Sequence, residues 1–111
     1  MIAYLITSDA IGSQDPELGR LLMRNFFLKL LSASVKPSHL LFLERGVQLL
    51  LPDSPALDAL KILAAEMNTE LLACQTCLDY YGIKEKIAVG KISNMPEIIE
   101  TLHEAEKVIR L

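Results

Sequence analysis

The sequence predicts an α/β domain whose sheet is parallel and doubly wound. Short apolar runs rich in Leu, Ile and Val alternate along the chain with longer segments of helical spacing. Each run is nearly continuous in apolar residues, which is typical of strands covered on both faces. Two helical segments begin with a capping residue and a proline, Asp15-Pro16 and Ser54-Pro55. No linker, repeat or low-complexity stretch interrupts this order, so we expect one domain over residues 1–111.

The first half of the chain is expected to supply two strands and two helices. A partly β-branched apolar run opens the chain and ends in a polar loop that contains Gly12. The second apolar run is closed by Arg45-Gly46. The expected elements are a strand over Ile2–Thr7, a helix from Pro16 to about Ser32, a strand over His39–Leu43, a short segment over Val47–Leu51 and a helix over Ala56–Met67.

The second half contains three further strands, and two cysteines follow the first of them. Gly82 can end a short helical turn, and Asn94 with Glu97 three residues later resembles a capping box. The expected elements are a strand over Glu70–Ala73, a turn over Cys74–Cys77, a helical turn over Leu78–Tyr81, a strand over Ile87–Ile92, a helix over Pro96–Glu104 and a strand over Lys107–Leu111.

The first helix carries two apolar stripes. Leu21 and Leu28, one heptad apart, form the second stripe and are flanked by polar and basic side chains. This stripe is either a set of scattered surface residues or a subunit contact, and the mean hydropathy of +0.33 leaves an apolar surplus that an interface would cover. Helical spacing places the first stripe on one broad face for packing on the sheet: Leu22, Met23, Phe26, Phe27 and Leu30.

Composition and charge argue against several classes of partner. The net charge is −3 and the 11 basic residues are scattered, whereas phosphate binding needs clustered Lys and Arg, so no nucleic acid is expected. The longest apolar stretches fall far short of the ~20 residues that cross a bilayer, so no membrane is expected. The N-terminus lacks the basic lead-in of a signal peptide, and we therefore expect a cytoplasmic protein. Two cysteines in that reducing compartment are expected to be free or redox-active thiols.

Cys74 and Cys77 are the candidate catalytic residues. The pair, Cys74-Gln75-Thr76-Cys77, follows a strand and precedes a helical segment, so it is predicted to lie at the carboxyl edge of the sheet. Free N–H groups at a helix start stabilise a thiolate, so we expect both thiols to be more acidic than a free cysteine. A thiolate attacks sulfur, which suits sulfur transfer or disulfide exchange. The alternative is that both cysteines are small buried hydrophobic residues.

No metal site and no cofactor are expected. A Cys-x-x-Cys pair needs two further ligands to hold zinc, and the only histidines are His39 and His103. His39 is predicted to start its strand at the edge opposite the cysteines, and His103 lies late in a helix. No Ser/His/Asp set or carboxylate pair can be argued from the spacing.

A longer stretch around the cysteines resembles a known family. The stretch Leu72-Ala73-Cys74-Gln75-Thr76-Cys77-Leu78-Asp79-Tyr80-Tyr81-Gly82-Ile83-Lys84-Glu85-Lys86, followed by Val89-Gly90 and Ser93-Asn94-Met95, is similar to the DsrE-like domain of YedF-type selenium-metabolism proteins. The resemblance implies a three-layer α/β/α fold with five parallel strands. It also implies a superfamily that relays sulfur as cysteine persulfide and often forms trimers or hexamers.

The resemblance also implies roles for the two cysteines. Cys74 stands eight residues before Gly82, as the sulfur-accepting cysteine of TusD-type relatives stands before a glycine, so Cys74 would be the acceptor and Cys77 the resolving thiol. Gln75 replaces a glycine of the YedF-type motif, and Glu44-Arg45 replaces a more usual Asn-Ser. The YedF-type sulfur-carrier domain has no counterpart, so a TusA-like carrier, with other sulfur donors and acceptors, would act in trans.

Two classes of function follow. The first is a sulfur or selenium relay protein, with sulfurtransferase-like chemistry on Cys74 and Cys77. The second is a non-catalytic oligomeric binding module in which the cysteines only pack. A dithiol oxidoreductase is less favoured, because the pair lacks the proline of a thioredoxin-type motif.

Overall fold

The computed structural model, which describes residues 1–111, contains one sheet with the strand order β4-β3-β2-β1-β5. Every neighbouring pair of strands is parallel, which confirms the predicted parallel sheet of five strands. The strands are β1 (Ile2–Ile6), β2 (His39–Phe42), β3 (Glu70–Cys74), β4 (Lys91–Ser93) and β5 (Lys107–Arg110).

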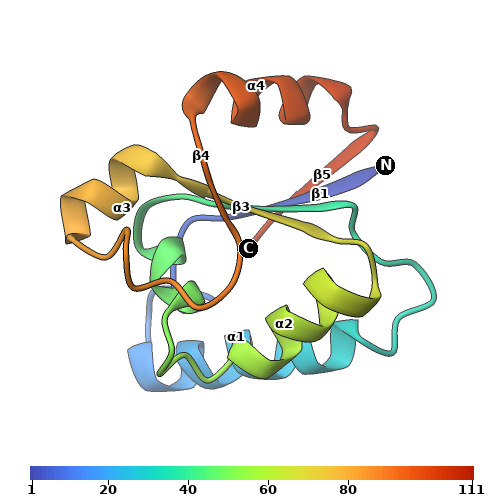
Figure 1. Ribbon diagram of the computed structural model, residues 1–111. Coiled ribbons are helices and arrows are strands. Elements are labelled where there is room, and N and C mark those ends of the chain that lie inside the picture. The colour runs from blue at the N-terminus through green and yellow to red at the C-terminus, as the bar shows by residue number, and fades with distance from the viewer.

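Helices cover both faces of the sheet and make three layers (Figure 1). Two α-helices and a 3₁₀-helix lie on one face, a single helix lies on the other, and a short helix extends β3 at the carboxyl edge. The helices are α1 (Pro16–Leu30), the 3₁₀-helix η1 (Glu44–Leu50), α2 (Leu57–Glu66), α3 (Gln75–Tyr81) and α4 (Met95–Glu104).

The two faces bury very different amounts of apolar surface. Between the sheet and α1, α2 and η1 lies a large core of 17 buried residues. The core under α4 has only five buried residues, and the cysteine among them is one of the candidate site residues. Its members are Ala3, Leu41, Leu72, Cys74 and Ile98.

The predicted starts at Asp15-Pro16 and Asn94 and the predicted stop at Gly82 are confirmed, whereas the capped start at Ser54-Pro55 is wrong, because α2 begins at Leu57 after Ala56 and has no side-chain cap. The Asp15 carboxylate accepts the Leu18 N–H at 3.1 Å, and Pro16 occupies the first position of α1. Likewise, the Asn94 side chain accepts the Glu97 N–H at 2.9 Å at the start of α4. Gly82 ends α3 with φ 66°, a left-handed conformation that glycine adopts without strain.

The strand predicted over Ile87–Ile92 is wrong over its first four residues, because β4 covers only Lys91–Ser93. Ala88 donates its N–H to the Leu50 carbonyl at 2.8 Å instead of joining a strand ladder. Gly90 then turns the chain with φ 93°. The apolar side chains in this segment belong to a loop and pack against the larger core. The segment is therefore apolar because it is partly buried, although it pairs with no strand.

The face that α1 turns to the sheet also differs from the prediction. Leu22 is 43% exposed, and the buried residues of the helix are Gly19, Met23, Phe27 and Leu30. A Cβ on Gly19 would lie 2.8 Å from the Ile11 carbonyl oxygen. The helix therefore approaches the preceding loop through Gly19, and Leu22 lies on a side of α1 that the core does not cover.

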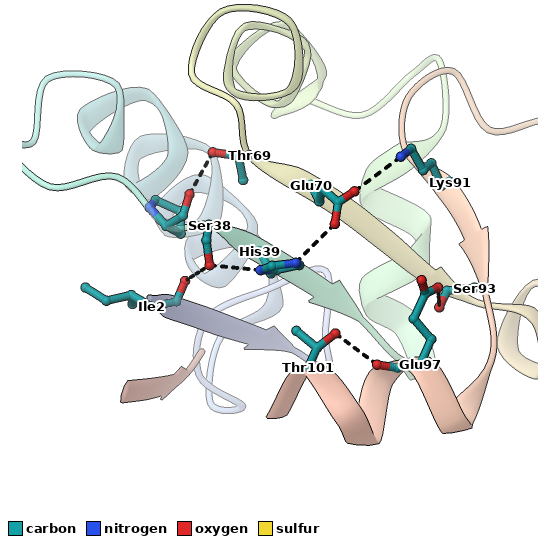
Figure 2. Close-up of polar contacts among 10 residues, drawn as sticks. Ile2, Ser38, His39, Thr69, Glu70, Lys91, Ser93, Glu97 and Thr101 are labelled. Carbon is teal, nitrogen blue, oxygen red and sulfur yellow. Dashed lines mark hydrogen bonds and ion pairs between the residues drawn. The ribbon is translucent and has the colours of Figure 1, made fainter. Parts of the chain in front are cut away.

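A row of polar side chains joins the starts of four strands (Figure 2). The Ser38 hydroxyl donates to the Ile2 carbonyl at 3.1 Å and contacts His39 Nδ1 at 2.8 Å. His39 Nε2 lies 3.1 Å from one carboxylate oxygen of Glu70, and Lys91 Nζ lies 3.3 Å from the other. The amino edge of the sheet is thus held by side chains as well as by the backbone ladder.

Candidate functional site

The cysteine pair lies where β3 passes directly into α3. Cys74 is the last residue of β3, and α3 begins at Gln75. The predicted turn over Cys74–Cys77 is therefore wrong, because Cys77 already lies in the first turn of the helix. The chain needs no loop here, because Cys74 is still extended, with φ −63° and ψ 121°, and the next residue is helical. Both cysteines lie at the carboxyl edge of the sheet, as predicted.

The two thiols differ in burial. Cys74 is 2% exposed and belongs to the small core with Leu72 and Ile98, beneath α4. Cys77 is half-buried and packs at the margin of both cores. Both are free, and the Cys74 thiol is one of the groups that raise the pKa of Cys77. The site is thus a buried thiol with a more accessible thiol beside it.

Only one backbone N–H donates a hydrogen bond to either sulfur, and it comes from the segment that follows β2. Glu44 donates its N–H to Cys77 Sγ at 3.1 Å. Cys74 makes no capping hydrogen bond at the start of α3, so the expected donation from that helix is absent. The sequence argument missed Glu44, although Glu44 follows β2, the neighbour of β3, at the same edge of the sheet.

Burial controls the acidity of the accessible thiol. The pKa of Cys77 is raised above its ordinary value, first because burial disfavours the thiolate. The Glu44 N–H opposes this effect, whereas the neighbouring Cys74 thiol and the Glu44 carboxylate raise the pKa further. For Cys77 the expectation of a more acidic thiol is therefore wrong, and the resting group is a neutral thiol.

An ion pair crosses the edge of the sheet next to the cysteines. Arg45 contacts the Asp9 carboxylate at 3.4 Å and 3.2 Å, and this contact raises the pKa of the guanidinium. Asp9 comes from the loop after β1 and Arg45 from η1, so the loops after β1 and β2 meet at this edge. On α3, Tyr80 is 83% exposed and meets Tyr81 edge-on, with ring centroids 5.2 Å apart.

No groove of the structure opens onto the cysteines. The two largest grooves, of about 520 and 530 Å³, lie beside α1 and at the amino edge of the sheet. Neither they nor the three smaller grooves are lined by Cys74 or Cys77. Access to Cys74 is therefore limited by its burial, and Cys77 is the more accessible of the two thiols.

Neither histidine lies near the cysteines. His39 belongs to the amino edge, and His103 is exposed in the last turn of α4. The structure gathers no group of three or more His, Cys, Asp or Glu side chains that could hold a metal ion. None of its helices combines the length and the apolar character needed to cross a membrane.

Comparison with known proteins gives a family and two structural neighbours. The model of the DsrE/DsrF-like family matches residues 2–111. The crystal structure of the ychN protein from E. coli superimposes with a TM-score of 0.70 at 20% identity, over 98% of this chain and 97% of that one. A protein of unknown function, MTH1491 from Methanobacterium thermoautotrophicum, gives a TM-score of 0.68 at 18% identity, over 99% and 97%. No curated protein matches the chain.

Proposed function

Because the chain belongs to the DsrE/DsrF-like family, which is associated with sulfur relay, we propose that it carries sulfane sulfur as a persulfide on Cys74, with Cys77 as the resolving thiol. The observation that supports this proposal is the pair of free thiols, three residues apart, at the carboxyl edge of the sheet. The resemblance to YedF-type domains extends the proposal to selenium in place of the carried sulfur.

The chemistry needs two steps. In loading, the Cys74 thiolate attacks the terminal sulfur of a donor persulfide, the donor leaves as a thiol, and Cys74 becomes a persulfide. In resolution, the Cys77 thiolate attacks Cys74 Sγ and the bond from Cys74 to the carried sulfur breaks. The carried sulfur leaves as hydrosulfide and a Cys74–Cys77 disulfide forms, which two thiols of an external reductant return to the starting pair.

The burial of Cys74 supports storage of sulfur. A persulfide under α4 would be shielded from water and from stray thiols, because Cys74 is only 2% exposed. A neutral Cys77 would leave that persulfide intact until the resolving thiol loses its proton. Since no groove leads to the pair, we propose protein donors and acceptors in trans, among them a TusA-like carrier.

Intact-protein mass spectrometry after incubation with inorganic polysulfide tests this proposal. Polysulfide is small enough to enter a nearly closed site. We expect an adduct of one sulfur atom on the wild type, its loss in Cys74→Ser and its retention in Cys77→Ser. An adduct that survives Cys74→Ser and disappears in Cys77→Ser would overturn the role given to Cys74. No adduct on any variant would overturn sulfur carriage altogether.

The second candidate function is a non-catalytic oligomeric binding module. The burial of Cys74 among Leu72 and Ile98 favours it, because a cysteine that only packs would have such surroundings. In that case polysulfide leaves no adduct, and Cys74→Ala changes only stability. The same mass measurement therefore separates the two functions.

A further inference from the structure

Glu44 has a backbone conformation that glutamate rarely adopts. Its φ is 51°, and the only other non-glycine residue with positive φ is Asn68, at 55°. Asparagine tolerates this left-handed region because its short polar side chain can bond locally, whereas glutamate is strained there. The structure around Glu44 must therefore impose the conformation.

Contacts on both sides of Glu44 impose it. Leu43 donates its N–H to the Ile6 carbonyl at 3.0 Å, and Gly46 donates to the Leu43 carbonyl at 2.8 Å. A Cβ on Gly46 would lie 2.1 Å from the Ile6 carbonyl oxygen, so only glycine lets η1 approach the end of β1 this closely. The start of η1 is thus fixed against β1 at two points, and Glu44 lies between them.

The strained conformation directs one N–H to sulfur. The ladder between β2 and β1 ends with the Leu43 N–H, and the next N–H, that of Glu44, has no carbonyl partner in the sheet. It donates instead to Cys77 Sγ at 3.1 Å. A hydrogen bond to sulfur stabilises the thiolate more than the thiol, because the thiolate is the stronger acceptor.

We propose that Glu44 is a positioning residue, whose left-handed backbone presents the N–H that holds the Cys77 sulfur at the carboxyl edge of the sheet. The role of Cys77 as resolving thiol rests on the proposed function, whereas the Glu44–Cys77 contact does not. The backbone and the side chain of Glu44 act in opposite directions on the same thiol. The action of the N–H is the larger of the two, and burial of the thiol outweighs both.

The electrostatics of Cys77 support the two opposing actions. Among the influences on its pKa, the Glu44 N–H is the one that lowers it, and the Glu44 carboxylate is among those that raise it. The other titratable group facing Cys77 is the Cys74 thiol. Replacing Cys74 by serine removes that second group and isolates the effect of Glu44.

The test measures the Cys77 thiol in the Cys74→Ser variant, with Glu44→Gln added. Glutamine keeps the backbone N–H and removes the carboxylate, and Glu100→Gln, on the exposed side of α4, is the matched control. Because glutamine keeps the N–H and burial is the largest cause of the raised pKa, we expect Glu44→Gln to move the ultraviolet thiolate titration only slightly to lower pH and to speed iodoacetamide alkylation at neutral pH only slightly. Glu100→Gln should leave both unchanged. Equal behaviour of the two glutamine variants would overturn the action of the carboxylate.

Nuclear magnetic resonance tests the N–H separately. In the Cys74→Ser variant the Glu44 amide cross-peak should move with the Cys77 titration, and Cys77→Ser should abolish that movement. A Glu44 amide cross-peak whose position does not change as Cys77 titrates would overturn the positioning role. Neither measurement uses polysulfide, so a failure to form the persulfide would reject the proposed function and leave the Glu44–Cys77 coupling to stand or fall on these data.

Discussion

Gly46 controls the approach of η1 to β1, and through it the place of the Glu44 N–H. An alanine there would put its Cβ 2.1 Å from a backbone oxygen of β1, which cannot move without breaking the sheet. We expect Gly46→Ala to lower the free energy of unfolding by about 3 kcal/mol or more in urea denaturation.

Gly82→Ala is the matched control for this substitution. Its φ of 66° also disfavours alanine, but a Cβ there meets no atom within 4 Å. Gly82→Ala should lower the free energy of unfolding by only about 1 kcal/mol, the cost of placing alanine in a left-handed conformation. Equal losses at the two glycines would show that steric contact at Gly46 does not fix the start of η1.

Part of the candidate site could be predicted from the sequence because part of it is local. Two cysteines three residues apart after an apolar run define a strand-to-helix junction, and that junction places Cys74 and Cys77 at the carboxyl edge. The contribution of Glu44 could not be predicted in this way. Its conformation depends on the contact of Gly46 with Ile6, residues that lie 40 positions apart in the chain.

Among the elements, β2, β3 and β4 share one acidic group at their starts. Glu70 contacts Lys91 and His39, and its pKa is lowered below the ordinary 4.5, chiefly by the hydrogen bond from Lys91. A carboxyl group with a lowered pKa stabilises the fold above its unfolded pKa, and that contribution is lost as the pH falls through the folded one. Because Glu70 is half-exposed, we expect less than about 1 kcal/mol.

Urea denaturation from neutral pH down to about pH 3 measures this contribution. The wild type should lose more stability over this range than Glu70→Gln, which has no charge to lose. Glu100→Gln, which shares none of these contacts, should follow the wild type. A Glu70→Gln curve parallel to that of the wild type would show that the carboxylate adds nothing to the strand starts.

The sequence pattern predicted the elements well where periodicity and capping agree. Asp15-Pro16 and Asn94 locate the starts of α1 and α4 because capping is a local interaction. The pattern wrongly predicted a strand in the loop before β4. Ile87 and Val89 pack against the larger core, but the Ala88 N–H donates to the Leu50 carbonyl and not to a neighbouring strand. Hydrophobicity reports burial, and it reports strand pairing only when a neighbouring strand is available.

At the scale of the molecule, α1 presents apolar side chains that the domain itself does not cover. Leu21 and Leu28 are 51% and 38% exposed, and Leu22 lies beside them at 43%. Covering a leucine fully is worth roughly 1.5–3 kcal/mol. We therefore expect a homo-oligomer, and light scattering should give a mass well above 12.3 kDa.

Leu21→Glu combined with Leu28→Glu should reduce that mass without unfolding the domain, because both side chains point away from the cores. Asp58→Asn on the exposed side of α2 is a control that should leave the mass unchanged. A wild-type monomer at micromolar concentration would contradict the assembly. An oligomer that tolerates both glutamates would place the interface on another surface.

The row of side chains across the strand starts also restricts where the hydrogens of Ser38 and His39 can lie. The Ser38 hydroxyl has one proton, and when it donates this proton to the Ile2 carbonyl its oxygen is left to accept from His39 Nδ1. His39 Nε2 faces the Glu70 carboxylate and must be a donor as well. Only the imidazolium ion satisfies all three contacts together. Each of the two neutral tautomers leaves one of these contacts without a hydrogen, so the number of bonds across the strand starts depends on where the ring carries its hydrogens.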